Sequence, residues 1–202
     1  MRILAAAALA AMTLLCAPAE AGSEPQIYYH PALLGSRTMP PLPNLPLYWL
    51  VERFPSQKAA EAASGQTGIA IEKDRKFWLF SIRHQGEWSS GSVHLTQVGP
   101  LPIPVGPRYT LRIGFGETTP ASQIRIHTHA GPETWYVVSG SQCAETPAGV
   151  LRSKILPPNT PVRLVTTSAH RRAFFMVLHD ATKPWTIPSG WRPTRLCDAQ
   201  IR

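Results

Sequence analysis

The chain has 202 residues and a formal net charge of +8. This length is enough for one domain with a sizeable hydrophobic core. The excess of Lys and Arg favours anionic partners through long-range attraction. These residues are dispersed, however, and form no face shared with aromatic side chains, so the composition argues against a nucleic-acid-binding protein.

Residues 1–21 have the pattern of a secretory signal peptide. Arg2 supplies the positive charge, residues 3–16 form an apolar run, and Ala19-Glu20-Ala21 is a small-x-small cleavage site. The apolar run is too short for a membrane-spanning helix, and no later stretch approaches the required length of about 20 residues. The sequence therefore predicts a periplasmic or secreted protein without an integral membrane span.

Removal of the signal peptide would leave two cysteines, Cys143 and Cys197. An even number of cysteines in an oxidising compartment favours a disulfide, which would pin the C-terminal tail to the strand after Gly140. The alternative is two unpaired thiols. The two positions are too far apart in the sequence for a thiol-redox motif.

The first part of the predicted mature chain, residues 22–46, is rich in proline and is predicted to be irregular. It is either a leader that packs along the fold or a flexible arm. A strand is expected over residues 47–51, followed by a short helix over residues 57–63 with Ser56 as its N-cap and Gly65 at its end.

Two further strands, residues 68–71 and 77–82, flank a charged turn. Together with the preceding strand and helix they form either a small accessory unit or extra strands on the main fold. The absence of a linker after them favours extra strands.

Short apolar runs separated by Gly and Pro dominate the rest of the chain, which is typical of an all-β sandwich or barrel. The expected strands cover residues 92–97, 109–115, 123–129, 134–138, 142–145, 150–155, 162–166 and 173–178.

A metal-ligand pattern lies at the centre of this region. His127 and His129 are two residues apart in a β-favouring run, so a strand would project both from the same face. Gly131-Pro132 supplies a turn, and Glu133 opens the next run. If the two runs pair across the turn, two imidazoles and one carboxylate converge, which is a donor set used by iron, manganese, zinc or nickel.

This spacing resembles the first motif of the cupin superfamily: His127, His129, Glu133 and Gly140 fall on it, and Ala121 takes the place of the leading Gly. The resemblance implies a cupin jelly-roll, a double-stranded β-barrel, over residues 108–182. Residues 22–107 would then be a proline-rich arm with accessory strands and one short helix, and residues 183–202 a basic tail. No internal repeat is visible, which indicates a single-domain cupin.

The second cupin motif is altered. Pro157 matches it, Asn159 replaces a turn Gly, and Val162 stands where the third metal His is expected. Thr166 replaces the trailing Asn, and Gly149 is a candidate for the leading Gly at a longer spacing.

Two readings of Val162 remain open. In one, three ligands suffice and leave coordination positions for substrate; in the other, the site has lost its metal and the pocket binds an organic ligand or nothing. His94, His170 and His179 could restore a fourth ligand, but histidines in such positions are more often at the surface or satisfied in the core.

The expected substrate pocket contains Arg125, Trp135 and Val162. Arg125 precedes His127 by two residues on the same strand face, so it could offer a cation to a carboxylate or enolate, or form a salt bridge at the rim. Tyr109 and Tyr136 are better explained by core packing than by acid catalysis.

Three functions are compatible with these observations. The first is a metal-dependent oxygenase or isomerase acting on a small organic substrate. The second is a small-molecule-binding cupin without catalysis, and the third is a homodimer formed through an apolar sheet face that carries Tyr136 and Val138. The resemblance does not choose among them, because one fold carries many functions.

Overall fold

The structure is a computed structural model that describes residues 31–201. The predicted signal peptide lies outside the described residues. Within them the fold is all-β, as the sequence predicted, apart from one α-helix and a short 3-10 helix. In chain order the elements are β1 (Ala32–Thr38), β2 (Tyr48–Phe54), α1 (Gln57–Ser64), β3 (Gly68–Lys73), β4 (Lys76–Arg83), β5 (Val93–Val98), β6 (Tyr109–Thr118), β7 (His127–Thr128), β8 (Glu133–Ser139), β9 (Gln142–Thr146), β10 (Gly149–Val150), β11 (Ile155–Leu156), β12 (Arg163–Thr166), β13 (Arg171–Asp180), β14 (Ile187–Pro188) and η1 (Asp198–Gln200).

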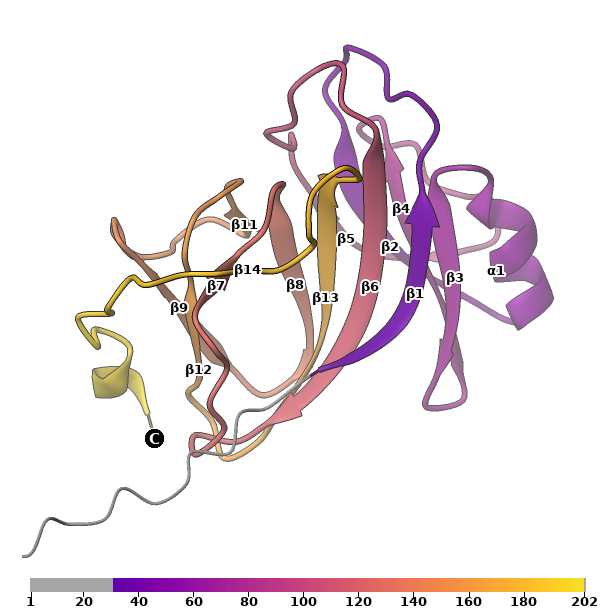
Figure 1. The fold of residues 1–202 in the computed structure, drawn as a ribbon. Coiled ribbons are helices and arrows are strands. Elements are labelled where there is room, and N and C mark those ends of the chain that lie inside the picture. The colour runs from indigo at the N-terminus through magenta and orange to yellow at the C-terminus, as the bar shows by residue number, and fades with distance from the viewer. Residues whose placement is uncertain (1–30, 202) are drawn as a thin grey trace, which may run out of the picture.

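The strands form three layers around a central antiparallel sheet (Figure 1). This sheet has the order β1-β6-β13-β8-β11, and a four-stranded sheet, β3-β4-β2-β5, packs on one of its faces. The other face is covered by two small sheets, β10-β9-β12 and β14-β7. Over residues 31–201 these sheets remain separate and do not close into one hydrogen-bonded barrel.

The main hydrophobic core lies between the central and the four-stranded sheets. Alternate residues of β6 and β13, such as Leu111 and Phe174, point into it and are buried against side chains of β2, β3 and β4. The Phe174 ring is the meeting point of this core, with ring centroids 5.0 Å from Trp78, 4.8 Å from Phe80 and 4.9 Å from Phe115. Residues on the opposite face of β6 and β13 are therefore left for the third layer.

The predicted helix is confirmed as α1. The Ser56 side chain accepts a hydrogen bond from the Ala59 amide at 3.2 Å, and Gly65 ends the helix with a φ of 53°. Ala60 packs against Phe54 and Leu79 on the outer face of the four-stranded sheet. The predicted strand-helix-strand-strand segment thus belongs to a layer of its own, and its strands β2, β3 and β4 do not pair with the central sheet.

The prediction that residues 22–46 are irregular is wrong for residues 32–38, which form β1 and pair antiparallel with β6. Pro31 and Pro40 bracket a run without proline, so every residue of β1 can donate a backbone hydrogen bond. The prolines thus limit the length of the strand but do not prevent it.

Two other strand predictions were too long. Of residues 123–129 only His127 and Thr128 form a strand, and the predicted strand over 150–155 is two short strands, β10 and β11, separated by an exposed turn. Strand β14 was not predicted, because the sequence of the proline-rich tail contains no alternation of apolar and polar residues.

Candidate metal site

The side chains of His127, His129 and Glu133 converge in the structure. The Nε2 atoms of the two histidines are 3.1 Å apart, and Nε2 of His129 is 3.4 Å from Oε2 of Glu133. One donor atom from each residue lies within 4.8 Å of the others. Donors held about 2.1 Å from one ion at tetrahedral or octahedral angles are roughly 3.0–3.4 Å apart, so the two shorter separations match a shared metal ion.

The protonation of both imidazoles follows from their backbone partners. Nδ1 of His127 lies 2.7 Å from the carbonyl oxygen of Arg125, and Nδ1 of His129 bonds to the carbonyl oxygen of Trp185. A carbonyl oxygen only accepts, so both Nδ1 atoms must donate. In each neutral ring, Nε2 then carries a lone pair and can only accept. The two Nε2 lone pairs face each other at 3.1 Å and repel unless a cation lies between them. Such carbonyl partners are the usual means of orienting metal-binding histidines.

Glu133 supports the same interpretation. The side chain is only 5% exposed, and within residues 31–201 its buried Oε2 atom accepts no hydrogen bond. A buried carboxylate oxygen without a partner is costly. A cation held jointly with the two Nε2 atoms would satisfy it, so the residues present fit a divalent metal.

The electrostatics of the site favour positive charge. Burial lowers the pKa of His129, but the negative charge of Glu133, the hydrogen bond that a protonated Nε2 can donate to Glu133 and the hydrogen bond to the Trp185 carbonyl outweigh it, so the pKa is raised above its usual value. A proton and a metal ion would therefore compete for the same place.

The local fold that brings the three donors together differs from the prediction. The runs containing His127 and Glu133 do not pair with each other: β7 pairs with β14, and β8 pairs with β13 and β11. The predicted hairpin is therefore wrong, although its consequence, the convergence of Glu133 with both imidazoles, is observed.

The turn between these runs docks on β13 instead. The Leu178 amide donates to the Pro132 carbonyl at 3.1 Å, and the Asp180 amide donates to the Ala130 carbonyl at 3.0 Å. At Gly131 a Cβ would collide with the carbonyl oxygen of Leu178, so only glycine permits this close approach. The docked turn directs Glu133 back toward the histidines.

Val162 lies beside the donor set, as its place in the motif predicted. It forms an isolated antiparallel bridge with His127 and is 3% exposed. The position of the expected third His thus holds an apolar side chain.

None of the other candidate histidines in the described chain joins the three donors. The ring of His94 stacks on Trp88, and the half-exposed His170 lies 3.9 Å from Glu117. Nε2 of His179 accepts a hydrogen bond from Nε of Arg112 at 3.1 Å. Burial and the positive charge of Arg112 lower the pKa of His179, and its lone pair is engaged away from the site.

The donors open into a cavity of about 310 Å³ between the central sheet and the third layer. The predicted pocket residues Arg125, Trp135 and Val162 all line it, with Arg125 exposed at the rim. Trp135 and Phe175, neighbours on paired strands, form an aromatic wall. The cavity is therefore mainly apolar around a polar corner formed by the three donors.

Among the cavity residues that sequence reasoning missed, Trp185 and Arg171 matter most for its chemistry. The Trp185 ring stacks between His129 and Phe175, with centroid distances of 5.6 and 6.2 Å, and Arg171 lines the cavity as a buried cation. Trp185 lies in the proline-rich tail and contributes a backbone carbonyl, which has no sequence signature. Arg171 falls between the expected strands over residues 162–166 and 173–178.

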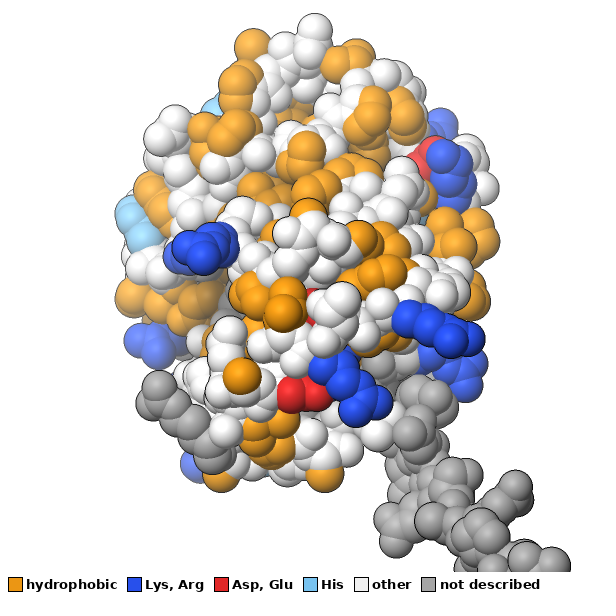
Figure 2. Space-filling model, turned by 90° about the vertical axis from the view of Figure 1, so that its left-hand side faces the viewer, with side chains coloured by type: hydrophobic (Ala, Val, Ile, Leu, Met, Phe, Trp, Pro, Cys, Tyr) orange, Lys and Arg blue, Asp and Glu red, His pale blue; other side chains and the backbone are white. Residues whose placement is uncertain are grey.

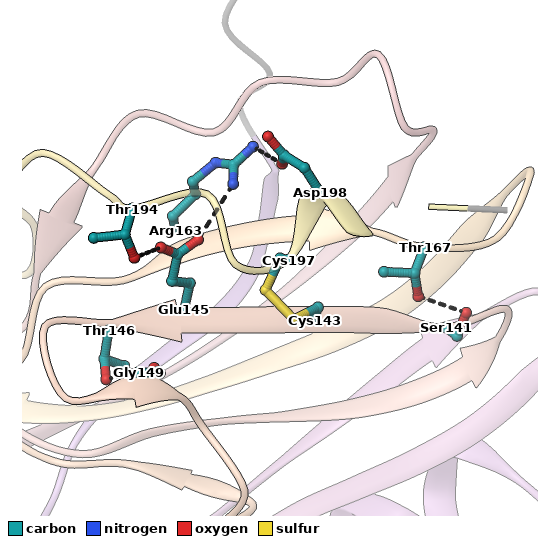
Figure 3. Close-up of a disulfide and its surroundings, with 10 residues drawn as sticks. All are labelled: Ser141, Cys143, Glu145, Thr146, Gly149, Arg163, Thr167, Thr194, Cys197 and Asp198. Carbon is teal, nitrogen blue, oxygen red and sulfur yellow. Dashed lines mark hydrogen bonds and ion pairs between the residues drawn. A yellow bond between two sulfur atoms is a disulfide. The ribbon is translucent and has the colours of Figure 1, made fainter. Parts of the chain in front are cut away.

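A disulfide and a polar cluster attach the tail to the third layer (Figure 3). Cys143 of β9 and Cys197 form the predicted disulfide, with Cα atoms 5.6 Å apart. Next to it, Glu145 accepts hydrogen bonds from Thr194 at 2.8 Å and from Arg163 at 3.3 Å, and Arg163 also pairs with Asp198. The tail between Trp185 and Cys197 is thus held against the cavity.

Basic side chains are spread over the surface that Figure 2 shows. On the face shown in Figure 2, Lys and Arg side chains are dispersed among apolar and neutral ones and do not gather into a patch. No helix in residues 31–201 is long and apolar enough to cross a membrane.

The sheet face suggested for dimerisation is covered within the chain itself. Tyr136 and Val138 pack against the main core, and the Tyr136 ring lies 5.8 Å from that of Trp78 on β4. The four-stranded layer therefore covers these two side chains in part.

Comparison of the chain with protein-family models, with curated proteins and with solved structures finds no match.

Proposed function

We propose that this chain is an exported cupin-type protein that holds a divalent transition metal through His127, His129 and Glu133 and acts as a metal-dependent enzyme on a small organic substrate. The observation that carries the proposal is the convergence of two Nε2 lone pairs and a buried carboxylate oxygen at the corner of a cavity. Iron, manganese, zinc and nickel all accept this donor set.

Backbone conformation supports the cupin assignment. Gly140 and Gly149, two glycines of the motifs, have φ values of 79° and 108°, and Asn159, at the turn-glycine position, has a φ of 57°. Asn tolerates this left-handed conformation better than other non-glycine residues. The third layer facing the central sheet is the arrangement from which a jelly-roll is built.

The chemistry follows from the open side of the site. A divalent metal supplies a Lewis acid with coordination positions left for substrate. The chain's own groups do the remaining work: the two backbone carbonyls orient the imidazoles, and Trp135, Phe175 and Trp185 exclude water from the cavity.

The metal content of the full-length protein tests the proposal. We expect close to one transition metal per chain by elemental analysis after incubation with Fe²⁺, Mn²⁺, Zn²⁺ or Ni²⁺ and desalting. His127→Ala and Glu133→Gln should lose the ion, whereas His170→Ala, which removes a half-exposed histidine outside the site, should keep it. A wild-type protein that retains none of the four metals would refute the proposal.

A second function, retention of a small molecule without turnover, is favoured by one observation. Val162 occupies the position of the fourth ligand with an apolar side chain, which enlarges the apolar lining at the expense of the metal site. A folded wild-type protein that binds small organic ligands but no metal would support this function.

A further inference from the structure

Arg171, the first residue of β13, is a buried cation in the same cavity as the metal donors. It is 3% exposed, and it lines the cavity together with Ala173 and Phe175, the next residues on the same face of the strand. Burying a guanidinium is costly unless hydrogen-bonding and charged partners compensate it. A guanidinium carries five N–H donors, so it can hold a neighbouring protein group and a ligand at the same time.

The strand register places Arg171 and the metal donors at opposite ends of the cavity. Glu133 is paired with Val177, and Trp135 with Phe175. Arg171 lies six residues before Val177, which corresponds to about 20 Å between the two backbone levels, and the long Arg and Glu side chains shorten this distance.

The wall between the two ends is apolar. Trp135, Leu164, Ala173 and Phe175 line it, and the Phe175 ring lies directly over Gly114, where a Cβ would collide with it. A ligand that fits this cavity is therefore elongated, with an apolar or aromatic body.

We propose that Arg171 is an anion-binding subsite and that the natural ligand is a small monocarboxylate with an apolar body. The carboxylate pairs with the guanidinium in the two-bond geometry that arginine favours, the body lies along Trp135 and Phe175, and the far end reaches the donor set. The net charge of +8 draws such an anion toward the protein. The proposal rests on the proposed function only in assuming that a metal is held by His127, His129 and Glu133 at the far end of the cavity.

The test compares two probes of matched shape, 4-phenylbutyrate and 4-phenylbutan-1-ol, by isothermal titration calorimetry with the full chain, both as purified and after treatment with a chelator. We expect the carboxylate to bind about tenfold more tightly than the alcohol, because a hydrogen bond to a charged group contributes about one factor of ten or more. This comparison needs no variant, so it remains informative if a substitution impairs folding. Equal affinities for the two probes would overturn the proposal.

Three variants locate the effect. Arg171→Gln should reduce carboxylate affinity to that of the alcohol and leave alcohol binding unchanged, and Arg171→Lys, which keeps the charge but loses the planar fork, should be intermediate. Arg152→Gln, which removes an exposed arginine outside the cavity, should bind like the wild type. A folded Arg171→Gln protein that still prefers the carboxylate tenfold would contradict the assignment.

The same proteins separate this proposal from the metal site. Arg171→Gln should retain its metal, and Glu133→Gln should lose the metal but still prefer the carboxylate. A wild-type protein that binds no metal but still prefers the carboxylate would refute the proposed function alone. A wild-type protein that binds metal but shows no preference for the carboxylate would refute the subsite alone.

Discussion

Two backbone carbonyl groups determine what His127 and His129 can do. By accepting from Nδ1, the carbonyls of Arg125 and Trp185 leave each neutral ring with a single available nitrogen, and both of these nitrogens face the same point. The site is thus preorganised by the main chain, and Glu133 completes it with a negative charge.

Replacing Val162 by histidine tests the geometry of this site. Val162→His introduces a nitrogen donor at the position bridged to His127, so we expect zinc affinity to rise at least about tenfold, measured by competition with a chromophoric chelator. Leu164→His is the matched control, because Leu164 lines the same cavity from the adjacent strand β12. Equal gains for both variants would show that position 162 does not face the ion.

The residues of the site were predictable to the extent that they share a local pattern. His127, His129 and Glu133 lie within seven positions, so a short-range motif could identify them. Arg171 and Trp185 could not be identified, because their approach to the site depends on the register of β13 and on the path of the tail, neither of which leaves a periodic signal.

At the scale of elements, the tail is the segment that the sequence describes least well. Its strand β14 covers two residues, Ile187 and Pro188, and pairs with β7, which is equally short. Such a brief pairing is weak by itself. The disulfide and the polar contacts around Glu145 therefore contribute much of the free energy that holds the tail against the third layer.

Removing the disulfide should loosen the tail. We expect Cys143→Ser/Cys197→Ser to lower the free energy of unfolding by about 2–4 kcal/mol, since the bridge closes a loop of 54 residues. Chemical denaturation of the wild type with and without reductant measures the same loss. Zinc affinity should fall with it, because the tail carries the Trp185 carbonyl that orients His129. Unchanged stability in the double variant would indicate that the polar contacts alone hold the tail.

The attachment of the tail should also depend on pH. Burial raises the pKa of Glu145, but hydrogen bonds from Thr194, from the amides of Leu196 and Cys197 and from Arg163 outweigh it, so the pKa lies below its usual 4.5. Because the folded-state pKa is the lower one, ionised Glu145 stabilises the fold above pH 4.5, and this stabilisation is lost as the pH falls through the folded-state pKa.

Chemical denaturation between pH 7 and pH 3 checks this expectation. Glu145→Gln should be less stable than the wild type at pH 7, and the difference should shrink toward pH 3. The control is Glu72→Gln, which removes an exposed carboxylate of β3 and should follow the wild-type curve. A constant difference between Glu145→Gln and the wild type at all pH values would contradict the assigned pKa direction.

The helix α1 and the strands around it were predicted better than the two-residue strands of the second half, for a physical reason. The helix α1 and strands β3 and β4 are joined by short turns and are specified by local capping and alternation. In contrast, β7, β11 and β14 cover two residues each and exist only because distant partners lie beside them.

At the scale of the molecule, the central sheet serves both adjacent layers. One face of β6 and β13 supplies the main core, and the other forms the floor of the cavity. The all-β class was predictable from the spacing of apolar runs, but the three-layer arrangement was not, because it depends on which faces pack together.

Substitution of Phe174 tests how tightly the central sheet packs against the four-stranded sheet. It is fully buried among Trp78, Phe80 and Phe115, so Phe174→Ala should lower the free energy of unfolding by about 3–5 kcal/mol in denaturant titrations. Val93→Ala, at an exposed position of β5, should change it by less than about 0.5 kcal/mol. If Phe174→Ala lowered the free energy of unfolding by less than about 1 kcal/mol, the central and four-stranded sheets would pack less tightly in solution than in this structure.

The bond between His129 and the Trp185 carbonyl joins positions 56 residues apart in the sequence. A bound ion would therefore report on long-range folding: its affinity measures whether the tail has docked. Cobalt(II), whose visible absorption changes with its ligands, could serve as an optical probe of this docking. In a denaturant titration, its spectrum should change before the tryptophan fluorescence of the main core does.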